Sequence, residues 1–217
     1  MPPEILQFLN ANASAVFGLL GALGGGVLSF VAALLLKQRD FRLQIRSKIV
    51  DRQIAAHERI LQLAQDLRTM GSLGTLDTDE EISRGPIILL SKNAFEDWFT
   101  LFTEQQLAGS TWLTTGTKRE VAFVQDYLGT LHMHLVDVPS KKYFDLAQLI
   151  RQDFIDLSSR LEKTAFAFFE TGIHRARLDS LSAWHKYKRP VTERRLANTA
   201  LVQKIAAFKN ALRELPT

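Results

Sequence analysis

The chain has 217 residues, of which 27 are Lys or Arg, 23 are Asp or Glu and none is Cys. Charged residues at 23% and hydrophobic residues at 46% are ordinary for a folded protein and exclude disorder along the whole chain. The lack of Cys excludes a disulfide framework, a thiolate zinc or iron–sulfur centre and a Cys nucleophile. Charge is unevenly distributed, because Glu4 is the sole charged residue among the first 36.

Residues 13–36 form a run of 24 uncharged residues rich in Leu, Val, Phe and Gly. As an α-helix this run would extend about 36 Å, enough to cross a hydrocarbon core of about 30 Å. A cleaved signal peptide is the alternative, but no basic start precedes the run, and Lys37 follows three Leu without a small-residue cleavage site. Residues 1–36 are therefore predicted to be an N-terminal segment and a transmembrane helix.

Basic residues follow the apolar run directly, and none precedes it. They are Lys37, Arg39, Arg42, Arg46, Lys48 and Arg52, accompanied by Asp40 and Asp51. Under the positive-inside rule this pattern places the N-terminus outside and residues 37–217 in the cytoplasm. We expect a single-pass protein of a bacterial-type inner (plasma) membrane, in which these bases can also contact anionic lipid headgroups.

Small residues gather on one face of the predicted membrane helix. This small-residue face consists of Gly18, Gly21, Ala22, Gly25, Gly26, Ser29 and Ala33. Such a face lets helix backbones approach closely, which favours association in lipid, where apolar surface alone gives no drive. It predicts a homo-oligomer or a tight partner helix. A glycine-rich anchor without a partner is the alternative.

Apolar residues recur at intervals of three and four along residues 37–217, which predicts helices and no strands. We expect an all-α fold in which the membrane helix continues into a cytoplasmic bundle of about five to six helices. The expected helices cover about 37–70, 92–107, 117–138, 140–171, 174–188 and 192–215. Expected boundaries are Gly71, Pro139, Gly172 and Pro190, with Thr117 and Glu120 as a capping pair.

The first helix of the bundle carries an apolar stripe with a seven-residue repeat, interrupted by Gln53. Its members are Ile49, Ala56, Ile60, Leu63, Leu67 and Met70. The stripe fits a coiled-coil seam between protomers, or packing against the other helices of its own domain. Packing within the domain is favoured, because the later helices also present apolar faces that need partners.

The motifs of common enzyme classes are missing from the sequence, including phosphate-binding loops, dinucleotide-binding glycine motifs and zinc-protease motifs. His132 and His134 are two residues apart, so on a helix they point about 200° from each other and cannot share a metal ion. The sequence therefore predicts no metal and no cofactor, and it favours a protein without enzymatic activity.

Arg52 and His57 are separated by four residues in the segment Arg-Gln-Ile-Ala-Ala-His. This spacing resembles the signature of the HEPN family of helical ribonucleases and RNA-binding modules. The resemblance covers six residues and implies an Arg that stabilises phosphate charge and a His that transfers a proton or contacts phosphate. Here the motif lies on the first helix of the bundle, whereas in that family it usually lies near the end. Arg52 and His57 are the candidate catalytic residues.

Residues 174–195 are strongly basic and also contain Trp184, His185 and Tyr187. The bases are Arg175, Arg177, Lys186, Lys188, Arg189, Arg194 and Arg195, against Asp179 and Glu193. Aromatic rings beside guanidinium groups suit stacking of unpaired bases and binding of RNA phosphates. The same composition suits anionic lipid or an acidic protein partner. A solvated helix face with the aromatic residues packed inward is the remaining alternative.

These features predict a single-pass membrane protein that self-associates through the small-residue face and acts as a membrane-anchored scaffold or effector. Its layout is similar to that of single-span proteins with HEPN-like bundles among accessory proteins of bacterial antiviral systems, which implies an effector that perturbs the membrane in antiviral defence. The alternative is a membrane-tethered HEPN-like RNA-binding protein or ribonuclease that uses Arg52, His57 and the basic 174–195 region.

Overall fold

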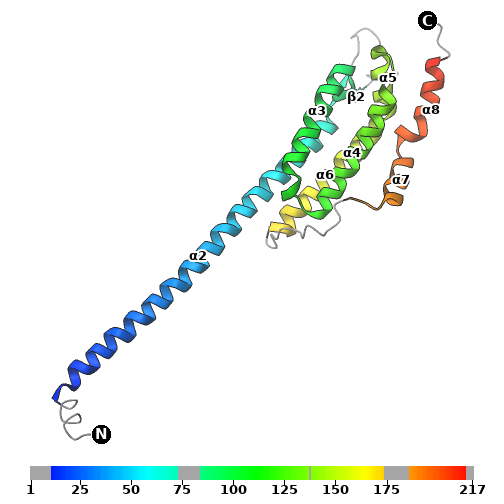
Figure 1. Cartoon of the computed structure of the whole chain (residues 1–217). Helices are drawn as coiled ribbons and strands as arrows, with labels where there is room; N and C mark the ends of the chain where they lie inside the picture. Colours follow the sequence, from blue (N-terminus) through cyan, green and yellow to red (C-terminus); the bar gives the residue numbers. More distant parts are fainter. Residues whose placement is uncertain (1–10, 73–83, 137, 174–185, 214–217) are drawn as a thin grey trace. The chain divides into compact units, whose positions relative to one another are not determined.

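The computed structural model describes residues 11–72, 84–136, 138–173 and 186–213 (Figure 1). These residues are mostly helical and include seven α-helices. The chain divides into two compact units, Met1–Lys48 and Ile49–Thr217. Helix α2 (Ala13–Arg68) begins in the first unit and ends in the second.

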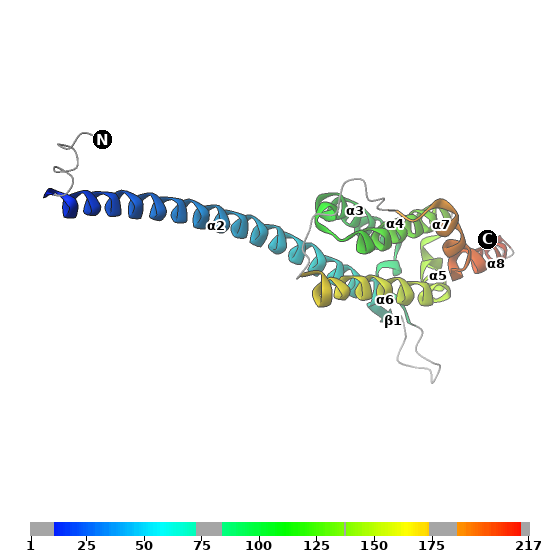
Figure 2. The ribbon, with the colours of Figure 1, turned by 90° about the horizontal axis from the view of Figure 1, so that it is seen from below.

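The second unit is built on the end of α2 together with α3 (Lys92–Gly109), α4 (Thr115–Leu135) and α6 (Arg151–Ala167). Their apolar faces meet in one core, in which Phe95, Leu128 and Phe154 are fully buried. α4 packs against α6. The Phe95 ring of α3 stacks on His132 of α4 with 6.1 Å between ring centroids. Figure 2 shows the ribbons of these helices. The predicted helical class is confirmed.

The apolar stripe of α2 is buried in this core. Ala56, Ile60, Leu63 and Leu67 pack with residues of other helices of the same chain, and Gln53 is buried beside them. This is the favoured of the two sequence-based interpretations. A coiled-coil seam between protomers would need the same side chains at the surface.

A short antiparallel pair of strands shows that the prediction of no strands was wrong. β1 (Met70–Ser72) pairs with β2 (Arg84–Pro86) in the register Met70↔Pro86, Gly71↔Gly85 and Ser72↔Arg84. α2 ends before Gly71, which is a strand residue rather than a helix stop. A Cβ atom on Gly85 would lie 3.0 Å from the Cβ atom of Ala147, so Gly85 permits β2 to lie close to α5 (Tyr143–Leu149).

The helix predicted over 140–171 is interrupted. It begins with the 3₁₀ turn η3 (Ser140–Lys142) and α5, and it changes direction at the buried Ile150 before α6. α6 then passes into the π-helical turn η4 (Phe168–Gly172). The interruption lets α5 contact β2 while α6 packs against α4.

Thr114, rather than Thr117, caps α4. Its side-chain oxygen accepts a hydrogen bond from the backbone N–H of Thr117. The Thr117 side chain is fully buried, and its hydroxyl lies 2.9 Å from that of Thr114. The predicted start of this helix was therefore wrong by about one helical turn. Glu120 does not take part in the cap and has the different role described below.

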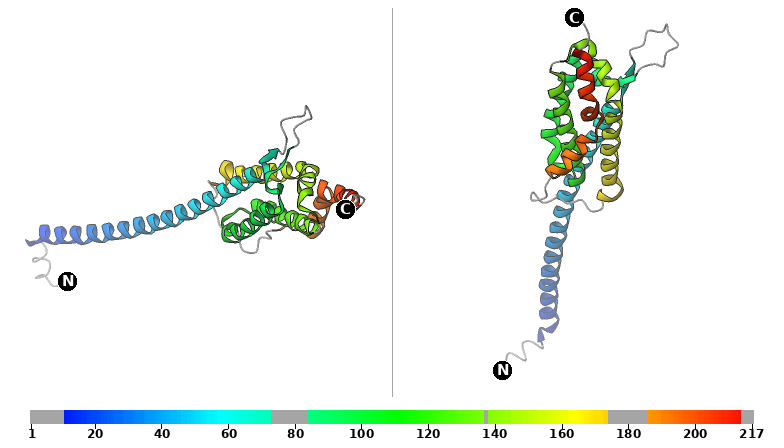
Figure 3. Two further views of the ribbon diagram at one scale, coloured as in Figure 1. Left: turned by 90° about the horizontal axis from the view of Figure 1, so that it is seen from above. Right: turned by 90° about the vertical axis from the view of Figure 1, so that its right-hand side faces the viewer.

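The C-terminal part forms α7 (Arg189–Ala197) and α8 (Ala200–Arg213) instead of one helix beginning at Thr192. Pro190 lies in the first turn of α7, where a missing N–H removes no helical hydrogen bond, so it starts a helix rather than ending one. α8 contacts α5 and α6 (Figure 3). Most of the helix predicted over 174–188 lies outside the described residues.

Candidate functional site

The apolar first part of α2 is exposed over residues 17–36. Its large apolar side chains are exposed, and Leu28, for example, is 73% exposed. α2 is long and apolar enough to cross a membrane, and none of its most apolar stretch is buried. An exposed apolar surface of this extent is typical of contact with lipid or with a partner.

The small-residue face lies on this open segment. A Cβ atom on Gly18, Gly21, Gly25 or Gly26 would meet no heavy atom within 4 Å in the described chain. Packing inside the described fold therefore gives no reason for glycine at these positions. Close approach of a second helix would give one, because glycine lets two backbones come together.

The basic residues that follow the apolar run are also exposed. They are Lys37, Arg39, Arg42, Arg46, Lys48 and Arg52. By helix geometry, Arg39, Arg42 and Arg46 share one side of α2, and Asp40 and Asp51 lie more than about 100° away. The cationic side is therefore not interrupted by an acid of its own helix.

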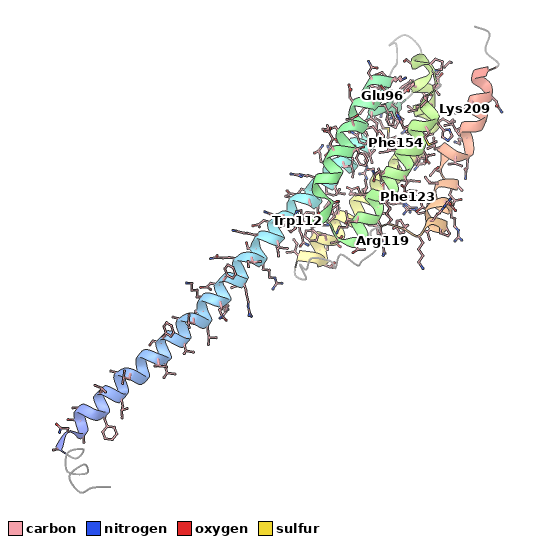
Figure 4. The ribbon with its side chains drawn as sticks, in the orientation of Figure 1. Glu96, Trp112, Arg119, Phe123, Phe154 and Lys209 are labelled. Carbon is pink, nitrogen blue, oxygen red and sulfur yellow. The ribbon has the colours of Figure 1, made fainter. Side chains whose placement is uncertain are left out.

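Arg52 and His57 are not brought together at a surface. The Cζ atom of Arg52 lies 4.9 Å from the centre of the ring of Trp112. Trp112 is labelled in Figure 4. His57 is fully buried. Five residues apart on one helix, the two side chains point about 140° from each other.

Both ring nitrogens of His57 have partners in the core. Nδ1 donates to the carbonyl oxygen of Gln53 at 2.7 Å, and Nε2 accepts from the backbone N–H of Thr114 at 3.4 Å. The ring stacks on Phe168 with 3.9 Å between centroids. Burial lowers the pKa of His57 below its ordinary 6.5 and outweighs the opposite effect of the bond to Gln53. His57 is thus suited to a structural role and poorly placed to transfer protons to RNA.

Arg195, which the sequence assigned to the basic surface, fastens α7 to α4. Its Nη1 and Nη2 atoms donate to the two carboxylate oxygens of Glu120 at 3.1 and 2.8 Å. Its Cζ atom lies 3.7 Å from the centre of the Phe123 ring on α4. The Tyr187 hydroxyl also donates to Glu120. A buried carboxylate paired in this bidentate way holds its partner strongly, so Arg195 is not available to an external ligand.

A second buried acid, Asp153 of α6, holds the beginning of α8. Its carboxylate oxygens accept hydrogen bonds from the backbone N–H groups of Ala200 and Leu201, each at 2.8 Å. It therefore caps α8 from a neighbouring helix. The Tyr127 hydroxyl donates to the same carboxylate at 3.0 Å. Burial, and then the charge of Asp153, raises the pKa of Tyr127 well above 10.0, so this hydroxyl keeps its proton.

Among the described bases of the basic region, Arg195 alone is not exposed. Arg175 and Arg177 lie outside the described residues; Lys186, Lys188, Arg189 and Arg194 are exposed. Arg189 pairs with Glu193. Lys186 and Lys188 flank Tyr187 and, with Arg119 of α4, line a hollow of about 400 Å³. Within the described residues neither lysine forms an ion pair.

Sequence reasoning missed the buried anchoring roles of Glu120 and Asp153, although each residue carries a signal. Glu120 lies four residues before Val124 on the apolar face of α4, and Asp153 lies four residues before Leu157 on that of α6. An acid on an apolar face is expected to have a buried partner. Local sequence could not identify these partners, because Arg195 lies 75 residues after Glu120 and Ala200 lies 47 residues after Asp153.

Comparisons with protein-family models, with curated proteins and with solved structures gave no match to this chain. Within the described residues no group of three or more His, Asp or Glu side chains could hold a metal ion. The features of the chain that bear on function are the exposed apolar segment, the cationic surface and the hollows of the second unit.

Proposed function

We propose that the protein is a single-pass membrane protein that self-associates through the small-residue face and presents its second unit in the cytoplasm as a scaffold or effector. The observation that carries this proposal is the open apolar segment 13–36, whose large side chains have no cover in the described chain. Each Leu, Val or Phe near the middle of a bilayer favours insertion by about 0.3 to 0.6 kcal/mol.

Orientation follows from the exposed bases that begin at Lys37. Positive charge beside a membrane helix is retained on the cytoplasmic side. The bases on one side of α2 also suit contact with anionic headgroups, each contributing about 1 kcal/mol near the surface. The proposed location is a bacterial-type inner membrane, with the N-terminus outside.

Self-association is supported by the geometry of the small-residue face. Members of the face fall within a sector of about 140° on a helix with 3.6 residues per turn. Gly24 lies outside that sector, and a Cβ atom there also meets nothing within 4 Å. Gly24 is therefore a matched control for Gly25, since an added Cβ atom meets nothing within 4 Å at either position.

The test is the mass of the purified protein in detergent or large nanodiscs, measured by mass photometry. We expect a discrete oligomer for wild type and for Gly24→Leu. Gly25→Leu should weaken it, and Gly21→Leu/Gly25→Leu should give monomers, because two Leu side chains keep the backbones apart. A monomeric wild type, or equal effects of Gly24→Leu and Gly25→Leu, would contradict the proposal. Ion-flux measurements on the same variants separate a membrane-perturbing effector from a scaffold.

A second proposed role is the binding of an anionic partner, RNA, lipid or acidic protein, at the surface of Lys186 and Lys188. The absence of ion pairs at both lysines within the described residues favours this role. The ribonuclease form of the HEPN-like alternative has little support, because the nitrogens of His57 are occupied.

RNA binding is tested by the fluorescence anisotropy of a labelled single strand at several salt concentrations. Loss of two phosphate contacts in Lys186→Gln/Lys188→Gln should lower the slope of log affinity against log salt by about 1.4. Lys163→Gln/Lys204→Gln, which changes two other exposed lysines, is the control. If both double variants reduce the slope equally, the surface is not a specific RNA site, and vesicles with anionic lipid become the next probe.

A further inference from the structure

A hollow of about 190 Å³ opens between α2 and α3 in the second unit. Its α2 side is formed by Ala56, Ile60 and Leu63, which are buried apart from this opening. Its α3 side is formed by Trp98 and Phe102, whose rings stack with 5.4 Å between centroids. The hollow is therefore apolar on both sides, with one wall made of parallel aromatic rings.

Charge at the rim of the hollow is separated along α2. Arg59 and Asp66 both line it, seven residues apart, which corresponds to about 10 Å along the helix axis. Asp66 accepts a hydrogen bond from Gln62 at 3.0 Å. In the part of the chain that the structure describes, Arg59 has neither a hydrogen bond nor an ion pair. The rim thus offers a cation at one end and an already engaged acid at the other.

The size of the hollow limits its ligand. An apolar cavity of about 150 Å³ holds benzene, so this one has room for an apolar group of about six to eight carbon atoms. The separation of Arg59 from Asp66 gives the ligand a direction, with an anionic group beside Arg59. An exposed Arg forms its most specific contacts with planar anions such as carboxylate.

We propose that the hollow between α2 and α3 binds a medium-chain carboxylate, with its apolar chain between the α2 side chains and the Trp98–Phe102 wall and its carboxylate on Arg59. This is a small-molecule site of the second unit. It depends on neither membrane assembly nor the cationic surface at Lys186 and Lys188, so its failure would leave both of those proposals standing.

Trp98 provides a reporter inside the proposed site. In the full-length protein in nanodiscs, 8-bromooctanoate should quench Trp98 fluorescence saturably, because bromine quenches on contact. The Trp98→Phe variant should lose the saturable component, although Trp112 and Trp184 still fluoresce. Competition with unbrominated carboxylates should show about a fourfold gain in affinity for each added methylene up to eight carbons. We expect no further gain at twelve carbons, because the hollow is then full.

Two variants separate the site from uptake of the probe by the bilayer. Ala56→Leu fills the hollow and should abolish saturable quenching, while partition into the nanodisc stays the same. Arg59→Gln leaves the apolar walls intact and should weaken binding up to about fivefold at low salt. Arg151→Gln, at an exposed arginine of α6 outside the hollow, is the matched control and should leave binding unchanged.

Circular dichroism of each variant checks the fold, and Arg59→Gln keeps the proposal testable if Ala56→Leu does not fold. Saturable quenching that requires Trp98 and weakens in Arg59→Gln but not in Arg151→Gln would support the site. The proposal is overturned by quenching equal in wild type and Ala56→Leu, or by affinity that keeps rising to twelve carbons. It is overturned equally if wild type shows no saturable quenching, as expected if a protein segment covers the hollow.

Discussion

The two ends of α2 have the same secondary structure and opposite surroundings. Leu35, in the first unit, is 62% exposed, whereas Leu67, in the second, is completely buried. In residues 13–36 apolar side chains occur on all sides of the helix, and from Gln53 to Leu67 they form one buried stripe. A helix that is apolar all round requires an external apolar environment, whereas a striped helix supplies one wall of a core. The spacing of apolar residues, rather than helix formation itself, therefore distinguishes the end of α2 that is buried in the core from the end that is exposed.

The difference between the two ends of α2 is tested most sharply by making the same substitution, Leu to Ala, at each end. Leu67→Ala should lower the free energy of unfolding of the second unit by about 3 kcal/mol, because it leaves a cavity in the core. Leu35→Ala should leave that free energy unchanged. Urea unfolding of the nanodisc-embedded protein, followed by circular dichroism, measures both. Equal effects at the two positions would show that they share one environment.

The same contrast applies to charged pairs. Glu120→Ala should lower the free energy of unfolding by about 2 kcal/mol, because it leaves Arg195 without its buried partner; the side chains of Arg195 and Glu120 are 16% and 9% exposed. Glu193→Ala removes the partner of Arg189 in a pair whose side chains are 89% and 60% exposed, and should cause no measurable change. Thermal unfolding compares the two variants. A large effect of Glu193→Ala, or none of Glu120→Ala, would refute the anchoring of α7 on α4.

Glycines give a third comparison. A Cβ atom on Gly172 would lie 2.6 Å from Cδ2 of Phe168, whereas one on Gly24 meets nothing within 4 Å. Gly172→Ala should displace Phe168 from His57 and lower the free energy of unfolding by about 1 kcal/mol. Gly24→Ala should have no effect on the second unit. Urea unfolding of both variants measures the difference. If Gly172→Ala leaves the free energy of unfolding unchanged, Phe168 can move aside without destabilising the second unit.

The smallest expected effect is a dependence on pH. The folded-state pKa of His57 lies below 6.5, so the unfolded chain binds a proton first as the pH falls. The contribution of His57 to the free energy of unfolding is therefore fully present above pH 6.5 and decreases as the pH falls below it. His134 acts in the same direction, because burial, and then Lys209, lowers its pKa. His57→Gln should make the decline between pH 7.5 and 5.5 shallower, as measured by urea unfolding. If the loss of stability between pH 7.5 and 5.5 is the same in His57→Gln and wild type, groups other than His57 cause it.

Local pattern predicted much of this fold. The apolar run of 13–36, the buried stripe of α2 and the faces of α3 and α4 follow from spacing alone, because a helix repeats every 3.6 residues. The interruption at Ile150 has no Pro or Gly to mark it and depends on contacts of α5 with β2. The pairing of β1 with β2 joins three-residue segments too short to show a pattern.

The candidate sites were predicted less well than the fold. Composition indicated a basic C-terminal region, but only tertiary contacts distinguish Arg195, which is bound to Glu120, from the exposed Lys186 and Lys188. The spacing of Arg52 and His57 carried no information about burial, and His57 belongs to the core. The hollow beside Trp98 had no sequence signal, because its apolar walls resemble any helix face.

The central claim, that residues 13–36 cross a membrane with the second unit in the cytoplasm, is tested most directly by cysteine labelling, since the chain has no Cys of its own. Single substitutions Asn10→Cys and Lys163→Cys would be treated with a membrane-impermeant maleimide in spheroplasts. We predict that Asn10→Cys is labelled in intact spheroplasts and Lys163→Cys only after lysis. A protein found in the soluble fraction, or labelling of Lys163→Cys in intact spheroplasts, would contradict the account.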